Sequence, residues 1–199
     1  AAAVAPEAKS AMILGIARAG QRVVAVGEHG VILLRDTPEA APRQAKSVPL
    51  DATLTAVSFA DAQRGWAVGH WGAIVATADG GENWQRQRID IDTDRPLFAV
   101  HFFDADNGVA VGLWSLVLTT ADGGKTWTHQ PTEFPAISSV QRQVLIRLRE
   151  GPLLFCSFTD LSANARKPNG MTFKSQKGDF NGAGLFAAIS FDDGKTWPH

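Results

Sequence analysis

The sequence predicts an all-β fold, a β-propeller built of four-stranded antiparallel blades, on two observations. The first is an eight-residue motif, Ser/Thr-x-Asp-x-Gly-x-Thr/Asn-Trp, which occurs at residues 77–84, 120–127 and 190–197. The second is a longer repeat, in which Asp79 and Asp122 of two copies lie 43 residues apart. This period is close to the ~40–50 residues of a propeller blade. We therefore expect about four blades, the last of them incomplete.

The first blade is expected over about residues 11–50, after an N-terminal tail at 1–10. Short apolar segments at 12–17, 22–27 and 31–35 alternate with turn residues, as strands of an antiparallel meander do. The turn that follows has lost both the Gly and the Trp of the motif. Terminal repeats are often atypical, so a degenerate first blade is unsurprising.

The second and third blades, about residues 53–92 and 97–130, carry the full repeat. In the second, strands are expected at 54–59, 66–69, 73–77 and 84–88. The first three are largely apolar and the fourth is polar. This difference indicates that the fourth strand lies at the exposed outer edge of the blade.

The last blade, about residues 137–199, differs in its pattern. Strands are expected at 144–149, 153–158 and 184–189, and a long polar insertion at 159–182 separates the last two. Long loops on a rigid scaffold often carry function. Three alternatives stay open for the missing outer strand: the N-terminal tail supplies it, the chain is truncated, or another chain completes the ring. An open blade edge predicts self-association, as a homo-oligomer.

The eight-residue motif, called the octet below, is interpreted as a structural clasp between two strands. Its Asp can accept hydrogen bonds from following backbone amides, its Gly can take a positive φ, and its Trp can pin the turn to the sheet. The clasp residues are Asp79, Gly81, Trp84, Asp122, Gly124, Trp127, Asp192, Gly194 and Trp197. A calcium loop is the alternative, but the octets lack its alternating oxygen ligands and distal Glu. No metal and no cofactor are expected.

Charge, apolar runs and the first residues limit the classes of partner and the cellular compartment that we expect. The net charge is −1 without a basic block, so no nucleic-acid partner is expected. No apolar run is long enough to span a bilayer. The single Cys156 is interpreted as a small buried hydrophobic residue on a strand. The start of the chain is compatible with a mature exported protein, periplasmic or lumenal, that begins after a small-residue cleavage site.

The octets resemble the Asp-boxes, or bacterial neuraminidase repeats, of β-propeller proteins. Residues 11–130 are similar to photosystem II stability/assembly factor-like proteins, through segments 54–59, 65–69 and 77–84 and their third-blade counterparts. This resemblance implies a non-catalytic, exported scaffold that binds a protein partner. Residues 137–199 look more like a blade of a sialidase-family propeller, and the change near Pro131 to Pro135 leaves a mixed origin open.

Catalysis finds little support in the residues. Sialidase chemistry, which the second resemblance would imply, needs a Tyr nucleophile, and the chain contains no Tyr. Other glycosidases need two carboxylates at a fixed separation, and no pair of acidic residues stands out. The five His are scattered without the spacing of metal ligands. We therefore expect that the chain is not an enzyme.

A binding surface is the better hypothesis. Trp71 and Trp114 occupy equivalent repeat turns, with His29 at that position in the first blade, and could be exposed anchors at one rim. Core packing explains them nearly as well. Three basic residues, Arg86, Arg88 and Arg95, follow the second octet, and a solvated outer strand is the slightly favoured account of them. The alternative to a protein partner is a carbohydrate, bound by the 159–182 loop.

Overall fold

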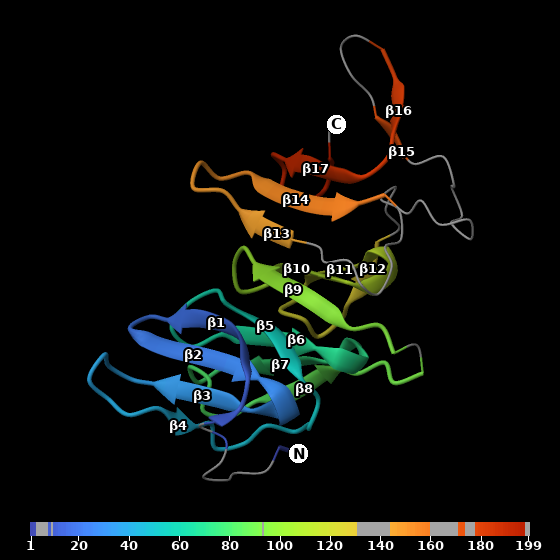
Figure 1. Cartoon of the computed structure of the whole chain (residues 1–199). Helices are drawn as coiled ribbons and strands as arrows, with labels where there is room; N and C mark the ends of the chain where they lie inside the picture. Colours follow the sequence, from blue (N-terminus) through green and yellow to red (C-terminus); the bar gives the residue numbers. More distant parts are fainter. Residues whose placement is uncertain are drawn as a thin grey trace. The chain divides into compact units, whose positions relative to one another are not determined.

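The computed structural model describes residues 1–2, 8, 10–92, 94–130, 144–159, 171–173 and 178–197. Within these residues the chain forms three four-stranded antiparallel sheets, one three-stranded sheet and one two-stranded hairpin (Figure 1). We call the four larger sheets blades 1 to 4 in chain order. The predicted all-β architecture of four-stranded antiparallel blades is confirmed.

The strands of blades 1 to 3 follow one another in sequence, whereas a hairpin separates the last two strands of blade 4. Blade 1 contains β1 (Ile13–Ala19), β2 (Arg22–Gly27), β3 (Ile32–Arg35) and β4 (Arg43–Gln44). Blade 2 contains β5 (Leu54–Phe59), β6 (Gly65–Gly69), β7 (Ile74–Thr77) and β8 (Gln85–Arg88). Blade 3 contains β9 (Leu97–Phe102), β10 (Asn107–Gly112), β11 (Leu116–Ala121) and β12 (Thr128–His129). Blade 4 contains β13 (Val144–Arg147), β14 (Leu153–Phe158) and β17 (Leu185–Ser190), and the hairpin pairs β15 (Met171–Phe173) with β16 (Phe180–Gly182).

The chain divides into two compact units. Unit 1 comprises Ala1–Ala110 and Leu118–His129, which are blades 1 and 2 and most of blade 3. Unit 2 comprises Val111–Val117 and Gln130–His199, including blade 4 and the hairpin.

Blades 1 and 2 pack face to face and form the main core of unit 1. Val24 and Leu34 of blade 1 share one buried cluster with Ala67, Val75 and Trp84 of blade 2. The innermost strands β1, β5 and β9 lie next to one another in that order (Figure 1). Successive side chains of a strand point to opposite faces of its blade. An inner blade therefore buries one set of side chains against the preceding blade and the other set against the following blade.

Blade 3 continues this packing on the other side of blade 2. The ring of Phe102 on β9 stacks on the indole of Trp66 on β6, with centroids 3.4 Å apart and an interplanar angle of 4°. Trp127, the last residue of the second octet, meets the same phenyl ring edge-on at 5.9 Å. Aromatic side chains thus fill the junction between the two blades.

The three octets share the hydrogen bonds to their Asp and to their first hydroxyl, and the indole bond occurs in the first and third. In the first, Asn83 N and Asn83 Nδ2 donate to the two carboxylate oxygens of Asp79, at 2.9 and 2.8 Å. Gly81 N donates to Thr77 Oγ1 at 3.0 Å, and Gly81 has a φ of 92°. The indole of Trp84 donates to the Gly81 carbonyl at 2.9 Å. The octets at 120–127 and 190–197 reproduce the bonds to Asp and to the Thr or Ser hydroxyl.

The structure departs from the sequence-based expectations in two elements. Blade 1 has a fourth strand, β4, although its turn has lost the octet. Its Arg43 pairs with Leu34 in the sheet and donates to Asp36 in the degenerate turn and to Glu82 in the octet of blade 2. The second departure is the β15–β16 hairpin, which lies inside the expected 159–182 loop. The remaining residues of that loop, 160–170 and 174–177, lie outside the described residues.

Candidate functional site

Three short turns place one large side chain each in a left-handed backbone conformation. They link the second and third strands of blades 1 to 3 and contain His29, Trp71 and Trp114, with φ of 54°, 56° and 56°. A positive φ is uncommon outside glycine, and rarer for a bulky residue. The indoles of Trp71 and Trp114 are 38% and 51% exposed. This exposure excludes core packing as the explanation of these two residues.

The turn of blade 2, His70–Gly72, is fixed by backbone hydrogen bonds. His70 N donates to the Thr53 carbonyl at 2.9 Å, which attaches the turn to the residue before β5. Ala73 N donates to His70 O at 3.1 Å, and Gly69 N donates to Ala73 O at 3.0 Å. The backbone of the turn can come this close to Thr53 only with glycine at position 69, because a Cβ there would lie 2.0 Å from the Thr53 carbonyl oxygen. Trp71 therefore projects from a rigid turn.

Side chains from the following segment support the same turn. Arg88 donates through Nη1 to the Gly72 carbonyl at 2.7 Å and through Nη2 to Asp90 at 2.8 Å. The amide of Asp90 donates to the Trp71 carbonyl at 2.8 Å. Arg88 thus positions the turn, and the sequence contains no signal that pairs it with Gly72 or Asp90.

The structure divides the three arginines that the sequence groups together. Arg88 and Arg95 both border Gly72, since a Cβ on that glycine would lie 2.3 Å from Arg88 Nη1 and 3.3 Å from the Arg95 carbonyl. The Nε of Arg95 is buried and has no hydrogen-bond partner among the described residues. Arg86 is exposed and stands apart. In the β7–β8 pairing, Arg86 pairs with Val75 and Arg88 pairs with Ile74, with a register shift between the two pairs. Ile74 and Val75 are consecutive in β7 and point to opposite faces of the sheet, so Arg86 and Arg88 also lie on opposite faces.

Trp114 lies in the equivalent turn of unit 2. The structure gives it the same backbone conformation as Trp71 and a larger exposed fraction. In blade 1 the same position holds His29, whose Nδ1 lies 3.4 Å from the carboxylate of Asp51. The repeat thus varies the exposed side chain while it keeps the backbone of the turn.

A charged network, which sequence reasoning missed, joins blade 1 to the first octet. Arg43 donates to Glu82 through both terminal nitrogens and to Asp36 through Nε at 3.1 Å. Arg22 bonds to Asp36 at 2.6 Å and to the carbonyl of Gly80 at 2.9 Å. The hydrogen bonds from Arg43 hold the pKa of Glu82 at about 2, although partial burial opposes this shift. Glu82 occupies a variable position of the octet. No local sequence pattern indicates that this position pairs with Arg43 of the preceding blade.

The octet aspartates are also held ionised. Hydrogen bonds from the Thr126 hydroxyl and amide lower the pKa of Asp122 to about 2, and Thr196 does the same for Asp192. The pKa of Asp79 is lowered as well, because bonds from Asn83 and Thr77 outweigh the effect of burial. A carboxylate that accepts several hydrogen bonds resists protonation. These acids are engaged in their turns.

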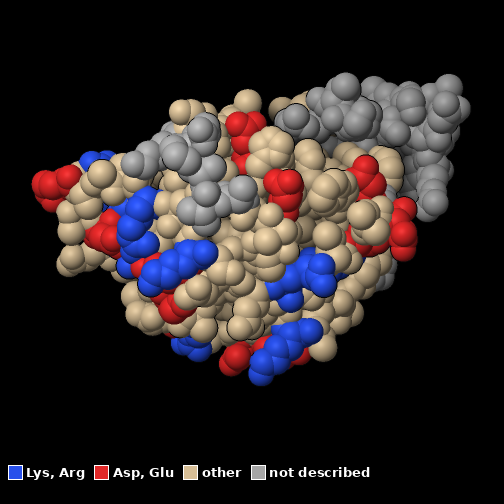
Figure 2. Space-filling model, turned by 90° about the horizontal axis from the view of Figure 1, so that it is seen from below, with Lys and Arg blue, Asp and Glu red and all other residues tan. Residues whose placement is uncertain are grey.

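On the face shown in Figure 2, basic and acidic side chains lie side by side and form no large field of one sign. The described residues contain no group of three or more His, Cys, Asp or Glu that could hold a metal ion. Nor do they include a helix of the length and apolarity that crossing a membrane would require.

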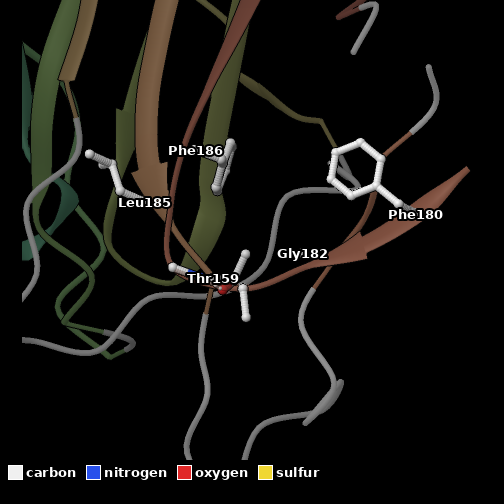
Figure 3. Close-up of a pocket in the computed structure, with 7 residues that line it drawn as sticks. Thr159, Phe180, Gly182, Leu185 and Phe186 are labelled. Carbon is white, nitrogen blue, oxygen red and sulfur yellow. Dashed lines mark hydrogen bonds between the residues drawn. The ribbon is translucent and has the colours of Figure 1, made fainter. Parts of the chain in front are cut away.

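A pocket of about 310 Å³ lies in unit 2, at the start of β17 (Figure 3). Phe180 of the hairpin and Leu185 and Phe186 of β17 provide most of its apolar lining. Among the described lining residues, the one polar side chain is that of Thr159, whose Oγ1 accepts a hydrogen bond from Gly184 N at 2.7 Å. A sugar or cofactor site needs several convergent polar groups, and the described lining supplies one that is already bonded.

Comparison with known proteins gives both family and fold. A family model described as photosynthesis system II assembly factor YCF48 matches residues 36–136, about half of the chain. No curated protein matches the sequence. A solved structure of YCF48 bound to a D1 peptide is similar over 95% of this chain and 68% of its own, with a TM-score of 0.60 and 19% identity. YCF48 from Cyanidioschyzon merolae is similar over 90% and 67%, with a TM-score of 0.56 and 16% identity.

Proposed function

This chain belongs to the photosynthesis system II assembly factor YCF48 family, and from that membership we propose a non-catalytic β-propeller scaffold that binds a protein partner. The binding surface that we assign is the turn His70–Gly72 in unit 1, with its exposed Trp71. Unit 2 carries an equivalent turn with Trp114, which we propose as a second contact point in its own right. We also infer that the protein works in a periplasm or a thylakoid lumen, which the family assignment supports.

The observation that carries this assignment is an exposed tryptophan held at a positive φ. A residue in the left-handed region costs roughly 1–3 kcal/mol unless it is Gly, and such strain collects at sites of function. Asn or Gly would fit the turn at lower cost. Solvent reaches 38% of Trp71 in the folded protein, so part of the indole is open to a partner. A contact made to a partner accounts for both this open surface and the retained backbone strain.

The supporting contacts suit a recognition site. Arg88, Asp90 and the Thr53 carbonyl fix the turn before any partner arrives, so binding does not have to order it. A preorganised aromatic side chain loses little conformational entropy on binding, and Trp is enriched among the residues that dominate interfaces.

Site-specific photo-crosslinking tests the assignment. A photoreactive amino acid replaces Trp71 or Trp114 in the protein expressed in its own host, and mass spectrometry identifies the captured protein. The matched control carries the same group at Gln63, which is exposed in the turn between β5 and β6, at the opposite end of β6 from the Trp71 turn. We expect a discrete adduct from position 71 or 114 and none from position 63. Equal labelling at all three positions, or no adduct at 71 and 114, would contradict the assignment.

A peptide offers a direct probe. The similar YCF48 structure contains a D1 peptide, so a fluorescent D1 peptide is the first ligand to titrate against this chain by anisotropy. We expect binding that weakens at least tenfold in Trp71→Ala and is unchanged in Gln63→Ala, at the opposite end of β6. Binding that Trp71→Ala leaves intact would place the peptide elsewhere on the protein.

A further inference from the structure

Two isoleucines border the Trp71 turn and leave much of their surface open to solvent. The amide of Asp90 donates to the Trp71 carbonyl at 2.8 Å, so Ile89 and Ile91, on either side of Asp90, lie beside the turn. Ile89 is 37% exposed and Ile91 is 64% exposed. We call Trp71, Ile89 and Ile91 the apolar patch. Large apolar side chains that are exposed together at one place mark an interaction site, whereas scattered ones need no explanation.

Both blades that neighbour the apolar patch are described. The patch joins the turn between β6 and β7 to the segment that leads from β8 into β9, all within unit 1. Blade 1 packs on one face of blade 2, and blade 3 packs on the other through Trp66 and Phe102. The patch stays exposed although both faces of its blade are covered. Its exposure is therefore a property of the end of the blade at which the turn lies.

Asp90 fixes the isoleucine segment at two points. Its amide bonds to the Trp71 carbonyl, and its carboxylate accepts a bond of 2.8 Å from Arg88 Nη2. Arg88 also donates to the Gly72 carbonyl. The turn and the segment that carries the isoleucines are thus tied to each other. A surface that is ordered before binding loses less conformational entropy when a partner arrives.

The exposed charges at the border of the apolar patch are acidic. The turn and the two segments bonded to it, residues 50–53 and 88–95, contain these ionisable residues: Asp51, His70, Arg88, Asp90, Asp92, Asp94 and Arg95. Arg88 and Asp90 form an ion pair and compensate each other. Arg95 is half-buried, whereas Asp51, Asp92 and Asp94 are exposed. Electrostatic complementarity then requires positive charge on the partner.

We propose that the apolar patch docks a segment of the partner protein in which a bulky apolar side chain stands next to a lysine or an arginine. This inference rests on the proposed binding role of Trp71 and specifies the chemistry that the site recognises. The apolar side chain packs on Trp71 and Ile91 and is removed from water. The basic side chain pairs with the acidic border and is also attracted by the face of the indole. The same border disfavours acidic segments and nucleic acid as occupants.

Selection of peptides from a random library tests the proposed chemistry. Dodecapeptides displayed on phage are selected on the full chain, and those that also bind Trp71→Ala are discarded, so that the retained peptides depend on the patch. We expect these peptides to be enriched in a large apolar residue next to Lys or Arg. Retained peptides that lack a basic residue would overturn the proposal, and so would a selection that retains none.

Matched variants then test the apolar part of the patch. Synthetic copies of the retained peptides are titrated against each variant by fluorescence anisotropy, and thermal unfolding checks that each variant is folded. Ile91→Ser should weaken binding at least tenfold. The control is Ile16→Ser, which changes a similarly exposed isoleucine, at 68%, on β1 and should leave binding unchanged. Equal affinity in Ile91→Ser and wild type would contradict docking on the patch.

A charge reversal tests the acidic border. Asp92→Lys should weaken binding of the same peptides at least fivefold at low salt and by less at high salt, because salt screens exposed charges. Glu39→Lys makes the same change of charge at an exposed residue between β3 and β4 and should have no effect. Unchanged binding in Asp92→Lys, or an equal loss in Glu39→Lys, would overturn the proposal.

These outcomes are separable from those of the proposed function. The photo-crosslink at position 71 shows whether a partner binds there, whatever the charge of its segment. A discrete adduct together with peptides that lack basic residues would retain the binding surface and overturn the partner chemistry. Basic peptides without any adduct from the host would retain the chemistry of the patch and overturn the proposed function.

Discussion

The indole Nε1 of Trp66 donates a hydrogen bond of 3.0 Å to the carbonyl of Gly123, which joins blade 2 to the octet of blade 3. Gln87 Nε2 donates to the same carbonyl at 2.9 Å. In the preceding junction, the carbonyl of Gly80 accepts from Arg22 of blade 1. The octets therefore contact the neighbouring blade in addition to the strands that they connect.

Replacement of Trp66 separates the hydrogen bond from the aromatic stack. Trp66→Phe keeps an aromatic ring against Phe102 and loses the bond to Gly123, so we expect a loss of about 1 kcal/mol of unfolding free energy. Trp66→Ala also removes a large buried side chain and should cost about 3–5 kcal/mol. Urea unfolding measures both values. Equal stability of Trp66→Phe and wild type would show that the bond contributes nothing.

A side chain at Gly124 is expected to reduce stability. It has a φ of 82°, and a Cβ there would lie 2.2 Å from Gln87 Oε1, so Gly124→Ala must displace a residue that bonds to Gly123. The matched control is Gly20→Ala, at a φ of 63° with Ala62 Cβ as its nearest neighbour at 3.1 Å. The strained backbone costs roughly 1–2 kcal/mol at both sites. Thermal unfolding should show a larger loss of stability for Gly124→Ala than for Gly20→Ala. Equal losses would show that the contact with Gln87 adds nothing to the backbone strain.

Acid should weaken the junction between blades 1 and 2 through Glu82. Its pKa is about 2 in the folded protein and 4.5 ordinarily, so its stabilising contribution is complete above pH 4.5 and is lost as the pH falls toward 2. We expect Glu82→Gln to lower the unfolding free energy at pH 7 by on the order of 2 kcal/mol or less, because water screens the partly exposed Arg43. The difference between wild type and variant should shrink over that pH range.

The control for Glu82 is Glu39→Gln, at an exposed position of the same charge. It should leave the acid unfolding curve close to that of wild type. A constant difference between wild type and Glu82→Gln from pH 7 to pH 2 would contradict the assigned role of the carboxylate.

Trp71 should matter for binding and not for stability. Trp71→Asn relieves the left-handed strain at φ 56° and loses the contacts of the covered part of the indole. The two effects oppose each other, so we expect an unfolding free energy within about 1 kcal/mol of wild type. Co-purification of the partner should fall at least tenfold. A large loss of stability would instead show that the indole supports the fold, as that of Trp66 does.

Arg88 should control the rigidity of the Trp71 turn. Arg88→Ala removes the bond to the Gly72 carbonyl and the ion pair with Asp90. The Asp90 amide, which donates to Trp71 O, should then exchange its hydrogen about tenfold faster, a change that corresponds to ~1.4 kcal/mol. Arg86→Ala, on the opposite face of the same strand, should leave this exchange rate unchanged.

Much of the fold could be predicted because its signals are local. The octets, the 43-residue spacing of Asp79 and Asp122 and the apolar segments between turns identify strands and blades from neighbouring residues alone. The β15–β16 hairpin and β4 escaped prediction for the opposite reason. Both are short, and β4 depends on Arg43 meeting carboxylates 7 and 39 residues away.

The candidate site was only partly predictable. The repeat alignment identified Trp71 and Trp114 as equivalent turn residues, since it compares positions within a unit. It could not say whether the indoles were buried, because exposure depends on where the turn lies on the folded sheet. Proximity in the sequence also grouped Arg86 with Arg88, which a register shift in the β7–β8 pairing assigns to opposite faces.

The sequence by itself determined the all-β class, the blade repeat and the octets, because turn chemistry and period are properties of short segments. Tertiary structure alone decided that Trp66 bonds to Gly123, that Arg88 supports the Trp71 turn, and that the two exposed tryptophans lie outside the core. These are contacts and exposures set by how strands register and sheets stack. Strand register and stacking arise from residues far apart in the chain, and no local pattern encodes them.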